Sequence, residues 1–283
     1  MKQSIPSAYR YALAAIALWV TLAVLGLSLK HIPAFLLTGI ALLIGGLPAV
    51  PFVLKDPAQW KVSASTLALG VYGLFGFHFL LFIALRHAPA VEVNLVNYLW
   101  PLLMVVLAPL LLPGLKLSAR HLAAALLGFA GAAVAILGAA GQTNGGWYWG
   151  YLAALASALI WSTYSLLTQR VRAFPTAAIG LFGLVSGLLS LLCHFLLEPA
   201  TVLSNRDWLL LTLMGLGPLG AAFYFWDRAL KIGDARQIGI LGYLTPLGST
   251  ALLLLATGQS LSWSIGLAAV MIIGAAILGA RAA

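Results

Sequence analysis

The stretch Asn97-Tyr98-Leu99-Trp100-Pro101-Leu102 decides the fold, because it recurs 145 residues later as Gly242-Tyr243-Leu244-Thr245-Pro246-Leu247. At the same offset, Ala84-Leu85-Arg86 matches Ala229-Leu230-Lys231. Two further matches, at offsets of 142 and 143 residues, pair Leu18-Trp19-Val20-Thr21 with Ile160-Trp161-Ser162-Thr163 and Gly131-Ala132-Ala133 with Gly274-Ala275-Ala276. Four matches in the same order, at nearly the same offset, indicate that the chain contains an internal duplication.

The composition places most of the chain in lipid. Hydrophobic residues make up 63% of the 283 residues and charged residues only 7%, whereas soluble domains carry about 25% charged residues. This composition excludes a soluble enzyme, a nucleic-acid-binding protein and a disordered chain. The single cysteine, Cys193, excludes an intramolecular disulfide and a cysteine-rich metal site. We expect neither a metal nor another cofactor.

Apolar runs separated by turn residues predict ten membrane-spanning helices of about 20 residues each. The first run follows Lys2 and Arg10 and is too long for a signal peptide, so we interpret it as a retained helix. The predicted spans are Tyr9–Leu29, Pro33–Leu54, Val62–Leu85, Ala90–Leu112, Arg120–Ala140, Trp147–Gln169, Thr176–Leu197, Trp208–Trp226, Ala235–Thr257 and Leu261–Ala280.

The distribution of basic residues supports this count and gives an orientation. With the N-terminus in the cytoplasm, 12 of the 15 Lys and Arg residues fall in inner segments, and only Lys30, Arg86 and Arg206 fall in outer loops. This is the bias that the positive-inside rule describes. We therefore expect both termini in the cytoplasm, and we attribute the net charge of +9 to inner loops rather than to a nucleic-acid partner.

The duplication divides the ten helices into two five-helix units, residues 1–143 and 144–283. Because five is odd, the second unit enters the membrane upside down relative to the first. The sequence thus predicts an all-α integral membrane protein with ten transmembrane helices as two inverted five-helix repeats. Inverted repeats are typical of secondary transporters, whose substrate sites lie near the membrane midplane between the repeats.

The repeated motifs resemble those of a known superfamily. Each unit has a Trp in its first helix, Ala-Leu and a basic residue after its third, and Pro-Leu within its fourth. These features are similar to the EamA-type drug/metabolite transporter (DMT) superfamily. Within it, His78, Asn94, Trp161 and the segment 97–101 most resemble the YddG-type amino-acid exporters. The resemblance implies export of aromatic and other neutral amino acids across the bacterial inner membrane.

Polar side chains at membrane depth mark the candidate substrate site, because such groups are costly in lipid. His78 lies within the third predicted helix among phenylalanines; it either binds substrate or hydrogen-bonds to a neighbouring helix. The fourth helix carries a face at i, i+3, i+4, i+7 spacing, formed by Asn94, Asn97, Tyr98 and Pro101. Such a face either lines a cavity or holds helices together.

The two units differ where a substrate site is expected. The tyrosines and prolines of the repeated stretch are retained, and we interpret Pro101 and Pro246 as helix breaks used in gating. A single asymmetric solute bound at the pseudo-twofold axis explains why other positions diverge. The diverging pairs are His78 and Phe223, Asn94 and Gly239, Asn97 and Gly242, and Trp100 and Thr245.

Three tryptophans lie too deep to be interfacial anchors, so they either wall an apolar cavity or belong to ordinary packing. On the sixth helix, Trp161 shares a face with Tyr164. The predicted substrate-binding residues are Trp19, His78, Asn94, Asn97, Tyr98, Trp100, Trp161, Tyr164 and Tyr243.

Amides, phenols and an imidazole can bind both ends of a zwitterion without fixed charge. No Lys or Arg lies at depth to bind a phosphorylated sugar. All six acidic residues fall at or near predicted helix ends, so we expect no deep carboxylate to carry a proton. These residues favour a neutral solute, and the resemblance to the superfamily implies that the solute is an amino acid and that it is exported. We therefore expect a monomeric amino-acid exporter in the lipid bilayer, working by alternating access. The alternatives are a carrier of another small neutral metabolite or drug, a channel, and an intramembrane enzyme, for which the sequence lacks a catalytic motif.

Overall fold

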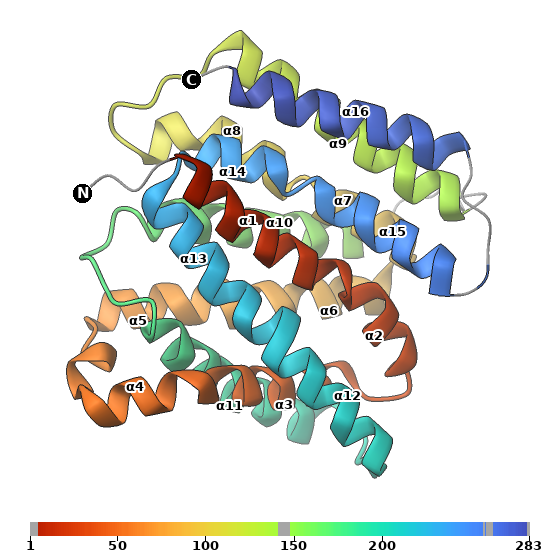
Figure 1. Cartoon of the computed structure of the whole chain (residues 1–283). Helices are drawn as coiled ribbons and strands as arrows, with labels where there is room; N and C mark the ends of the chain where they lie inside the picture. Colours follow the sequence, from red (N-terminus) through yellow and green to blue (C-terminus); the bar gives the residue numbers. More distant parts are fainter. Residues whose placement is uncertain (1–4, 141–147, 257, 259–262, 282–283) are drawn as a thin grey trace.

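The computed structural model describes residues 5–140, 148–256, 258 and 263–281, and this part of the chain is all-helical without strands (Figure 1). Nine helical stretches are long and apolar enough to cross a membrane. A tenth helix, α9 (Ala119–Ala140), has 22 residues. The predicted unit boundary at residues 143 and 144, and the predicted span limits Trp147, Thr257 and Leu261, lie outside the described residues.

The first five spans are mostly built from shorter helical segments. Four of them are interrupted, whereas α9 is continuous. The segments are α1 (Ile5–Val20) and α2 (Leu22–Ser28); α3 (Ala34–Gly46), η1 (Leu47–Ala49) and α4 (Val50–Lys55); α5 (Ala64–Val71), η3 (Tyr72–Gly76) and α6 (Phe77–His87); α7 (Ala90–Asn97) and α8 (Trp100–Leu111). A short segment, η2 (Pro57–Trp60), lies between α4 and α5.

The remaining spans are more regular. Only the eighth and ninth are interrupted. The segments are α10 (Gly150–Leu167); α11 (Ala178–Leu197); α12 (Asn205–Leu216), η4 (Gly217–Ala221) and α13 (Ala222–Ile232); α14 (Ala235–Leu241) and α15 (Leu244–Ala256); and α16 (Trp263–Ala280).

The repeated stretch interrupts two spans at equivalent places. The fourth span leaves helical geometry between Asn97 and Trp100, and the ninth does so between Leu241 and Leu244. Each interruption lies just before a proline, which cannot donate a backbone hydrogen bond within the helix. The helix therefore breaks twice, 144 residues apart, within the motif that is duplicated at an offset of 145 residues.

A second irregularity is also duplicated, and the sequence did not predict it. The third and eighth spans each contain a π-helical turn, Tyr72–Gly76 (η3) and Gly217–Ala221 (η4). These turns are 145 residues apart and precede His78 and Phe223. Such π-bulges widen the helix locally, shift carbonyl groups out of the regular ladder and are frequent at functional sites.

The prediction that the eighth span ends at Trp226 is wrong. Helix α13 continues to Ile232 through Asp227 and Lys231. These two side chains are one helical turn apart and form an ion pair of 2.6 Å, so both charges are satisfied without ending the helix. The prediction that every carboxylate lies at or near a helix end also needs correction, because Asp227 lies more than one turn before the end of α13 and is only 3% exposed.

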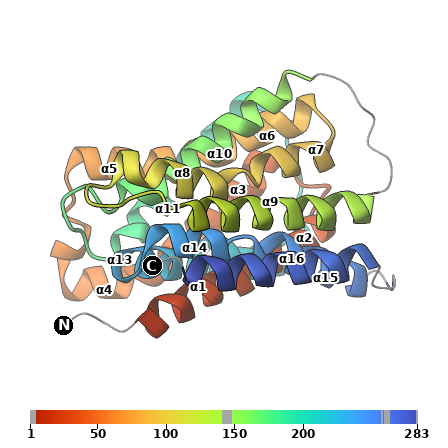
Figure 2. The same ribbon diagram turned by 90° about the horizontal axis from the view of Figure 1, so that it is seen from above.

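The helices pack in pairs that combine one half of the chain with the other. Helix α3 lies along α11, and α9 lies along α16. Helix α1 contacts α13, and α6 contacts α10. Figure 2 shows α9 and α16 side by side, and in Figure 1 they lie along the top of the bundle. Helix α1 begins and α16 ends at the same end of the bundle, on the left of Figure 1, which we call the terminal end.

The interface between α3 and the eighth span depends on close backbone approach. A Cβ atom added at Gly45 would lie 2.6 Å from the carbonyl oxygen of Leu219 and 2.8 Å from that of Gly215. These neighbours are backbone atoms, which move only with their helices. Glycine is therefore required at position 45 by the distance between two spans.

We expect Gly45→Ala to destabilise the protein by about 1–3 kcal/mol, because it overpacks this interface. Gly266→Ala in α16 is the matched control, since no heavy atom lies within 4 Å of a Cβ built there. Thermal unfolding of the purified protein in detergent measures both. Equal unfolding temperatures for the two variants would contradict the close approach.

Candidate functional site

Aromatic side chains from four separate spans meet near the middle of the bundle. We call Trp19, Trp100, Trp161, Phe223 and Trp226 the central aromatic cluster, and each is at most 7% exposed. The ring centroids of Trp19 and Trp226 are 5.1 Å apart, and those of Trp19 and Trp161 are 5.7 Å apart. The structure thus brings together the three tryptophans that the sequence singled out, in spacings typical of aromatic pairs.

Hydrogen bonds fix the indole rings of two cluster members. Trp19 Nε1 donates to the carbonyl oxygen of Pro218 at 3.1 Å, within the π-turn of the eighth span. Trp226 Nε1 donates to Ser165 Oγ at 3.1 Å. Since the polar edges of both rings have partners inside the protein, their apolar faces are held in defined positions.

The sequence analysis missed Trp226 because it ended the eighth span at that residue. In the structure Trp226 is 1% exposed and its ring centroid lies 5.6 Å from that of Trp100. A signal was present: Phe223, Trp226 and Leu230 follow helical i, i+3, i+7 spacing, and all three are buried. The charged residues between them concealed this period.

Two predicted polar residues border the cluster. The amide oxygen of Asn97 accepts a hydrogen bond from Ser157 Oγ at 3.3 Å, and the same hydroxyl lies 3.0 Å from the carbonyl oxygen of Phe77. Phe77 in turn packs against Trp161, with centroids 5.4 Å apart. Asn97 is 7% exposed, so the structure places an amide against the wall of the cluster, together with Ser157, which the sequence analysis missed.

His78 is half-buried beside the same wall. Its Nδ1 atom lies 2.6 Å from the carbonyl oxygen of Leu74, one turn earlier in its own span. If this nitrogen carries the proton, Nε2 is an acceptor. The His78 ring lies 5.0 Å from that of Phe77 and 6.4 Å from that of Phe223. The histidine therefore touches the cluster through ring contacts, and its hydrogen bond is made within its own span.

The other predicted residues are placed unequally. Tyr164 is buried, with its ring centroid 5.4 Å from that of Trp161, and Tyr98 is half-buried against the core. The side chain of Asn94 is exposed, unlike that of Asn97. Tyr243 is fully buried in a different group, against α9 and α16, with Ala132 and Ile272. The structure therefore does not bring Tyr243 into the central aromatic cluster.

Charged contacts tie the helices at the terminal end. Asp227 accepts hydrogen bonds from Lys231 Nζ at 2.6 Å and from Thr176 Oγ1 at 2.7 Å. Lys231 Nζ also donates to the carbonyl oxygen of Phe174 at 2.9 Å and lies 4.0 Å from the centre of its ring. The loop before α11 is thereby fastened to α13.

A second terminal-end contact joins the two halves of the chain. Arg236 forms an ion pair with Asp234, and its Nη1 donates to the carbonyl oxygen of Lys116 at 2.6 Å. Burial raises the pKa of Asp234, but hydrogen bonds from the side chain and backbone of Arg236 outweigh this effect and hold the pKa below its usual value. The carboxylate therefore stays charged at neutral pH and keeps the arginine in place.

At the opposite end, Arg86 has the role that Lys231 has at the terminal end. Its Nη2 lies 2.7 Å from Glu198 Oε1, and its guanidinium lies 5.4 Å from the centre of the Phe35 ring. Glu198 also accepts hydrogen bonds from the backbone nitrogens of Phe35 and Leu36, and from His194 at 3.1 Å. Arg86 and Lys231 are the basic residues of the duplicated Ala-Leu motif, so one motif serves both ends.

The chemistry available in the cluster is recognition rather than catalysis. Its polar groups are an amide, hydroxyls, an imidazole and indoles, all without fixed charge at neutral pH. Among the described residues, no group of three His, Cys, Asp or Glu side chains is arranged to hold a metal ion. An apolar wall with a few placed polar groups is typical of a small-molecule site.

Comparison with known proteins assigns the family. The family model described as "EamA-like transporter family" matches residues 6–137 and again residues 148–280. The protein named aromatic amino acid exporter YddG from Ancylobacter novellus is 40% identical over 277 residues, 93% of each chain. The protein of the same name from Salmonella typhimurium is 29% identical, over 79% of this chain and 77% of its own.

A crystal structure with 38% sequence identity superposes on this fold with a TM-score of 0.90 and covers 99% of both chains. Fold and site thus define a multi-pass helical transporter of the bacterial inner membrane, and not an enzyme. The chain belongs to the EamA-like transporter family. It works in lipid on a small-molecule substrate.

We expect Lys231→Met to destabilise the protein by about 3 kcal/mol, because it leaves the buried Asp227 carboxylate without its counter-charge. Adding Asp227→Asn to the same chain removes that charge and is expected to recover most of the loss. Thermal unfolding in detergent measures the cycle. If the double variant is as unstable as the two single losses added together, the two residues are not coupled.

Proposed function

We propose that this chain exports aromatic and other neutral amino acids across the bacterial inner membrane by alternating access. The observation that carries the proposal is the central aromatic cluster with Asn97 and His78 beside it. It is supported by 40% identity over 93% of the chain to a protein named aromatic amino acid exporter.

The cluster suits an amino acid for a chemical reason. Ring faces stack on aromatic and aliphatic side chains. The amide of Asn97 and the hydroxyl of Tyr98 offer both donors and acceptors to an ammonium and a carboxylate group. Among the described residues, the ion-paired side chains lie toward the two ends of the bundle. The cluster therefore favours a solute with no net charge.

Alternating access follows if residues 1–143 and 144–283 are inverted repeats. Three observations support this arrangement. The helix breaks recur at an offset of 144 residues, and the π-turns recur at an offset of 145 residues. The packing of α1 on α13 is matched by the packing of α10 on α6, which are their counterparts in the other half. In such a frame, each half can take the conformation of the other, which moves the opening from one side of the membrane to the other. One chain supplies every span needed, so we propose a monomer.

The proposal predicts counterflow in proteoliposomes. Vesicles loaded with unlabelled phenylalanine, threonine or methionine are expected to accelerate uptake of trace labelled phenylalanine, whereas vesicles loaded with a sugar are not. Asn97→Ala, His78→Ala and Trp226→Phe are each expected to slow uptake about tenfold, the cost of roughly one lost polar or aromatic contact.

The matched control is Phe195→Ala, an aromatic side chain that is 77% exposed and far from the cluster in sequence. Its counterflow is expected to equal that of the wild type. If no amino acid accelerates uptake by the wild type, the substrate assignment is wrong, and other neutral metabolites or drugs become the candidates. Uptake that neither saturates nor shows counterflow would indicate a channel.

The proposed orientation predicts a labelling pattern. In a Cys193→Ser background, Val202→Cys is expected to react with an impermeant maleimide in intact cells, because Val202 is 96% exposed in a loop assigned to the outside. Ala58→Cys, also exposed, is expected to react only after the membrane is permeabilised. The reverse pattern would invert the orientation, and labelling of both in intact cells would contradict the number of spans between them.

A further inference from the structure

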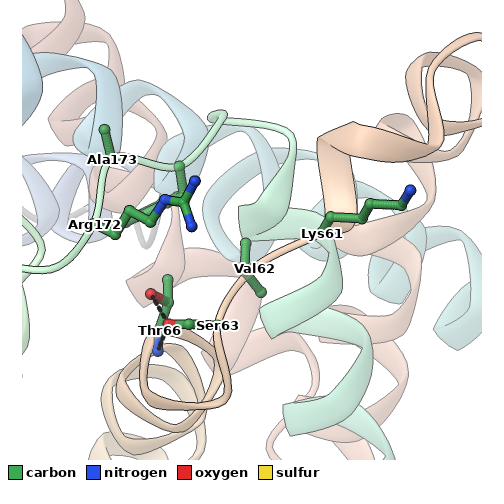
Figure 3. A pocket seen from close by; sticks show the side chains of 7 residues that line it. Lys61, Val62, Ser63, Thr66, Arg172 and Ala173 are labelled. Atoms are coloured by element: carbon green, nitrogen blue, oxygen red, sulfur yellow. Dashed lines mark hydrogen bonds between the residues drawn. The ribbon is translucent and has the colours of Figure 1, made fainter.

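A polar pocket of about 290 Å³ lies at the terminal end of the bundle, away from the central aromatic cluster. It is formed by two loops from different halves of the chain, one before α5 and one before α11 (Figure 3). The substrate proposal makes no use of it. The lining residues are Lys61, Val62, Ser63, Thr66, Arg172, Ala173 and Phe174.

Specific contacts hold the two loops together, so the pocket is built rather than incidental. Trp60 Nε1 donates to the carbonyl oxygen of Ala177 at 2.9 Å, which joins the first loop to the second. On the floor, Ser63 Oγ accepts from the backbone nitrogen of Thr66 at 3.1 Å and lies 2.8 Å from its hydroxyl oxygen. Behind Arg172, Phe174 is 7% exposed and is fixed by Lys231.

The lining of the pocket carries positive charge, which is offset only in part by the electrostatic attraction between Lys61 and Asp56. Lys61 and Arg172 are exposed, and neither forms an ion pair within the described ranges. The first turn of α5 contains no acidic residue. The carboxylate nearest in sequence, Asp56, is used by the backbone nitrogen of Ala58 at 3.0 Å and by Gln59 at 2.9 Å. Two cations and two hydroxyls therefore border a hollow with no anion.

Figure 3 shows how these groups lie. The guanidinium of Arg172 lies on the same side of Val62 as Ser63 and Thr66, whereas Lys61 lies on the other side of Val62 and its amine points away from Arg172. A planar guanidinium is the side chain best matched to phosphate oxygens, and a lysine adds a mobile point charge. The arrangement fits one phosphate group bound by Arg172 beside Ser63 and Thr66, with Lys61 adding positive charge at the border of the pocket.

We propose that this pocket binds the phosphate headgroup of an anionic phospholipid. The location decides for a lipid rather than free phosphate. The pocket lies where the second and sixth spans end, at Lys55 and Leu167, and where the third and seventh begin, at Ala64 and Ala178. Helix ends lie at the depth of lipid headgroups, and basic pockets between helices on the cytoplasmic side are typical sites for anionic headgroups.

Binding there has a consequence for the terminal end. Arg172 is two residues before Phe174, whose carbonyl oxygen and ring hold Lys231 against Asp227. A headgroup that orders the Arg172 loop also orders this contact. The inference rests on membrane insertion and on the proposed orientation, and it holds whatever solute is transported.

Native mass spectrometry of the full-length protein in detergent tests the site, with phosphatidylglycerol and phosphatidylcholine added in turn. We expect wild-type protein to retain phosphatidylglycerol in preference to phosphatidylcholine. Lys61→Gln/Arg172→Gln is expected to weaken phosphatidylglycerol binding about tenfold or more, since each basic residue near the surface contributes about 1 kcal/mol. Arg172→Gln alone, at an exposed position, is expected to show part of this loss and safeguards against misfolding of the double variant.

The matched control is Lys55→Gln/Arg120→Gln, which removes two exposed charges from the same end without touching the pocket. Its phosphatidylglycerol binding is expected to stay near the wild-type value. Equal weakening in the control would show general charge attraction and overturn the site. Loss of the lipid preference when inorganic phosphate is added would assign the pocket to free phosphate, and equal retention of both lipids would overturn anion recognition.

Discussion

In hydrocarbon, every backbone hydrogen bond that a helix gives up must be replaced from within the protein, and this constraint governs the structure. The irregular turns of the third, fourth, eighth and ninth spans are tolerated because they face other helices. The clearest case is Pro218, whose carbonyl oxygen lies in a π-turn and accepts a hydrogen bond from the indole N–H of Trp19. That hydrogen bond links the first span to the eighth and helps to set the position of the ring around which the central aromatic cluster is assembled. Irregular backbone and buried aromatic rings are thus parts of one arrangement.

Duplication and packing together explain much of the divergence between the halves. The sequence interpretation attributed the change from Asn97 to Gly242 to an asymmetric solute. The structure supplies a packing reason as well, since a Cβ at Gly242 would lie 2.2 Å from the Trp100 ring, and one at Gly239 would lie 3.1 Å from Met104. Helix α14 therefore needs small residues to admit α8. The equivalent face of α7 is free of that demand and carries the amide that hydrogen-bonds to Ser157. The halves differ partly because the large side chain of Trp100 in one half packs against Gly242 in the other, and the two copies cannot both carry a large side chain at this contact.

The sequence predicted the membrane spans, because an apolar run of about 20 residues is long enough to cross a bilayer. It also predicted that three tryptophans are buried, because they lie far from the ends of the predicted spans. The prediction failed where charged residues continue a helix instead of ending it. Asp227 and Lys231 look like a helix end when read singly, but they neutralise each other one turn apart and let α13 continue. That error concealed Trp226. The π-turns were also missed, since they depend on which neighbour takes the displaced carbonyl and not on local composition. Contacts such as Ser157 with Asn97, 60 residues apart, have no local signature at all.

The duplicated Ala-Leu motif connects the two ends of the molecule. Arg86 is held by Glu198 and the Phe35 ring, and Lys231 by Asp227 and the Phe174 ring, at opposite ends of the bundle. The two carboxylates differ in their position relative to the basic residue. Glu198 follows the seventh span and pairs with Arg86 of the third span, whereas Asp227 is in the same helix as Lys231. Parting the seventh span from the third at the Arg86 end separates an ion pair, whereas the Asp227–Lys231 pair stays together when the loop before α11 moves. The hydrogen bonds to Thr176 and Phe174 and the contact of Lys231 with the Phe174 ring are then lost. Within the proposed alternating-access cycle, opening of the terminal end therefore replaces these contacts by water and keeps the Asp227–Lys231 pair together, so no buried charge is left unpaired. Opening of the other end instead separates Glu198 from Arg86.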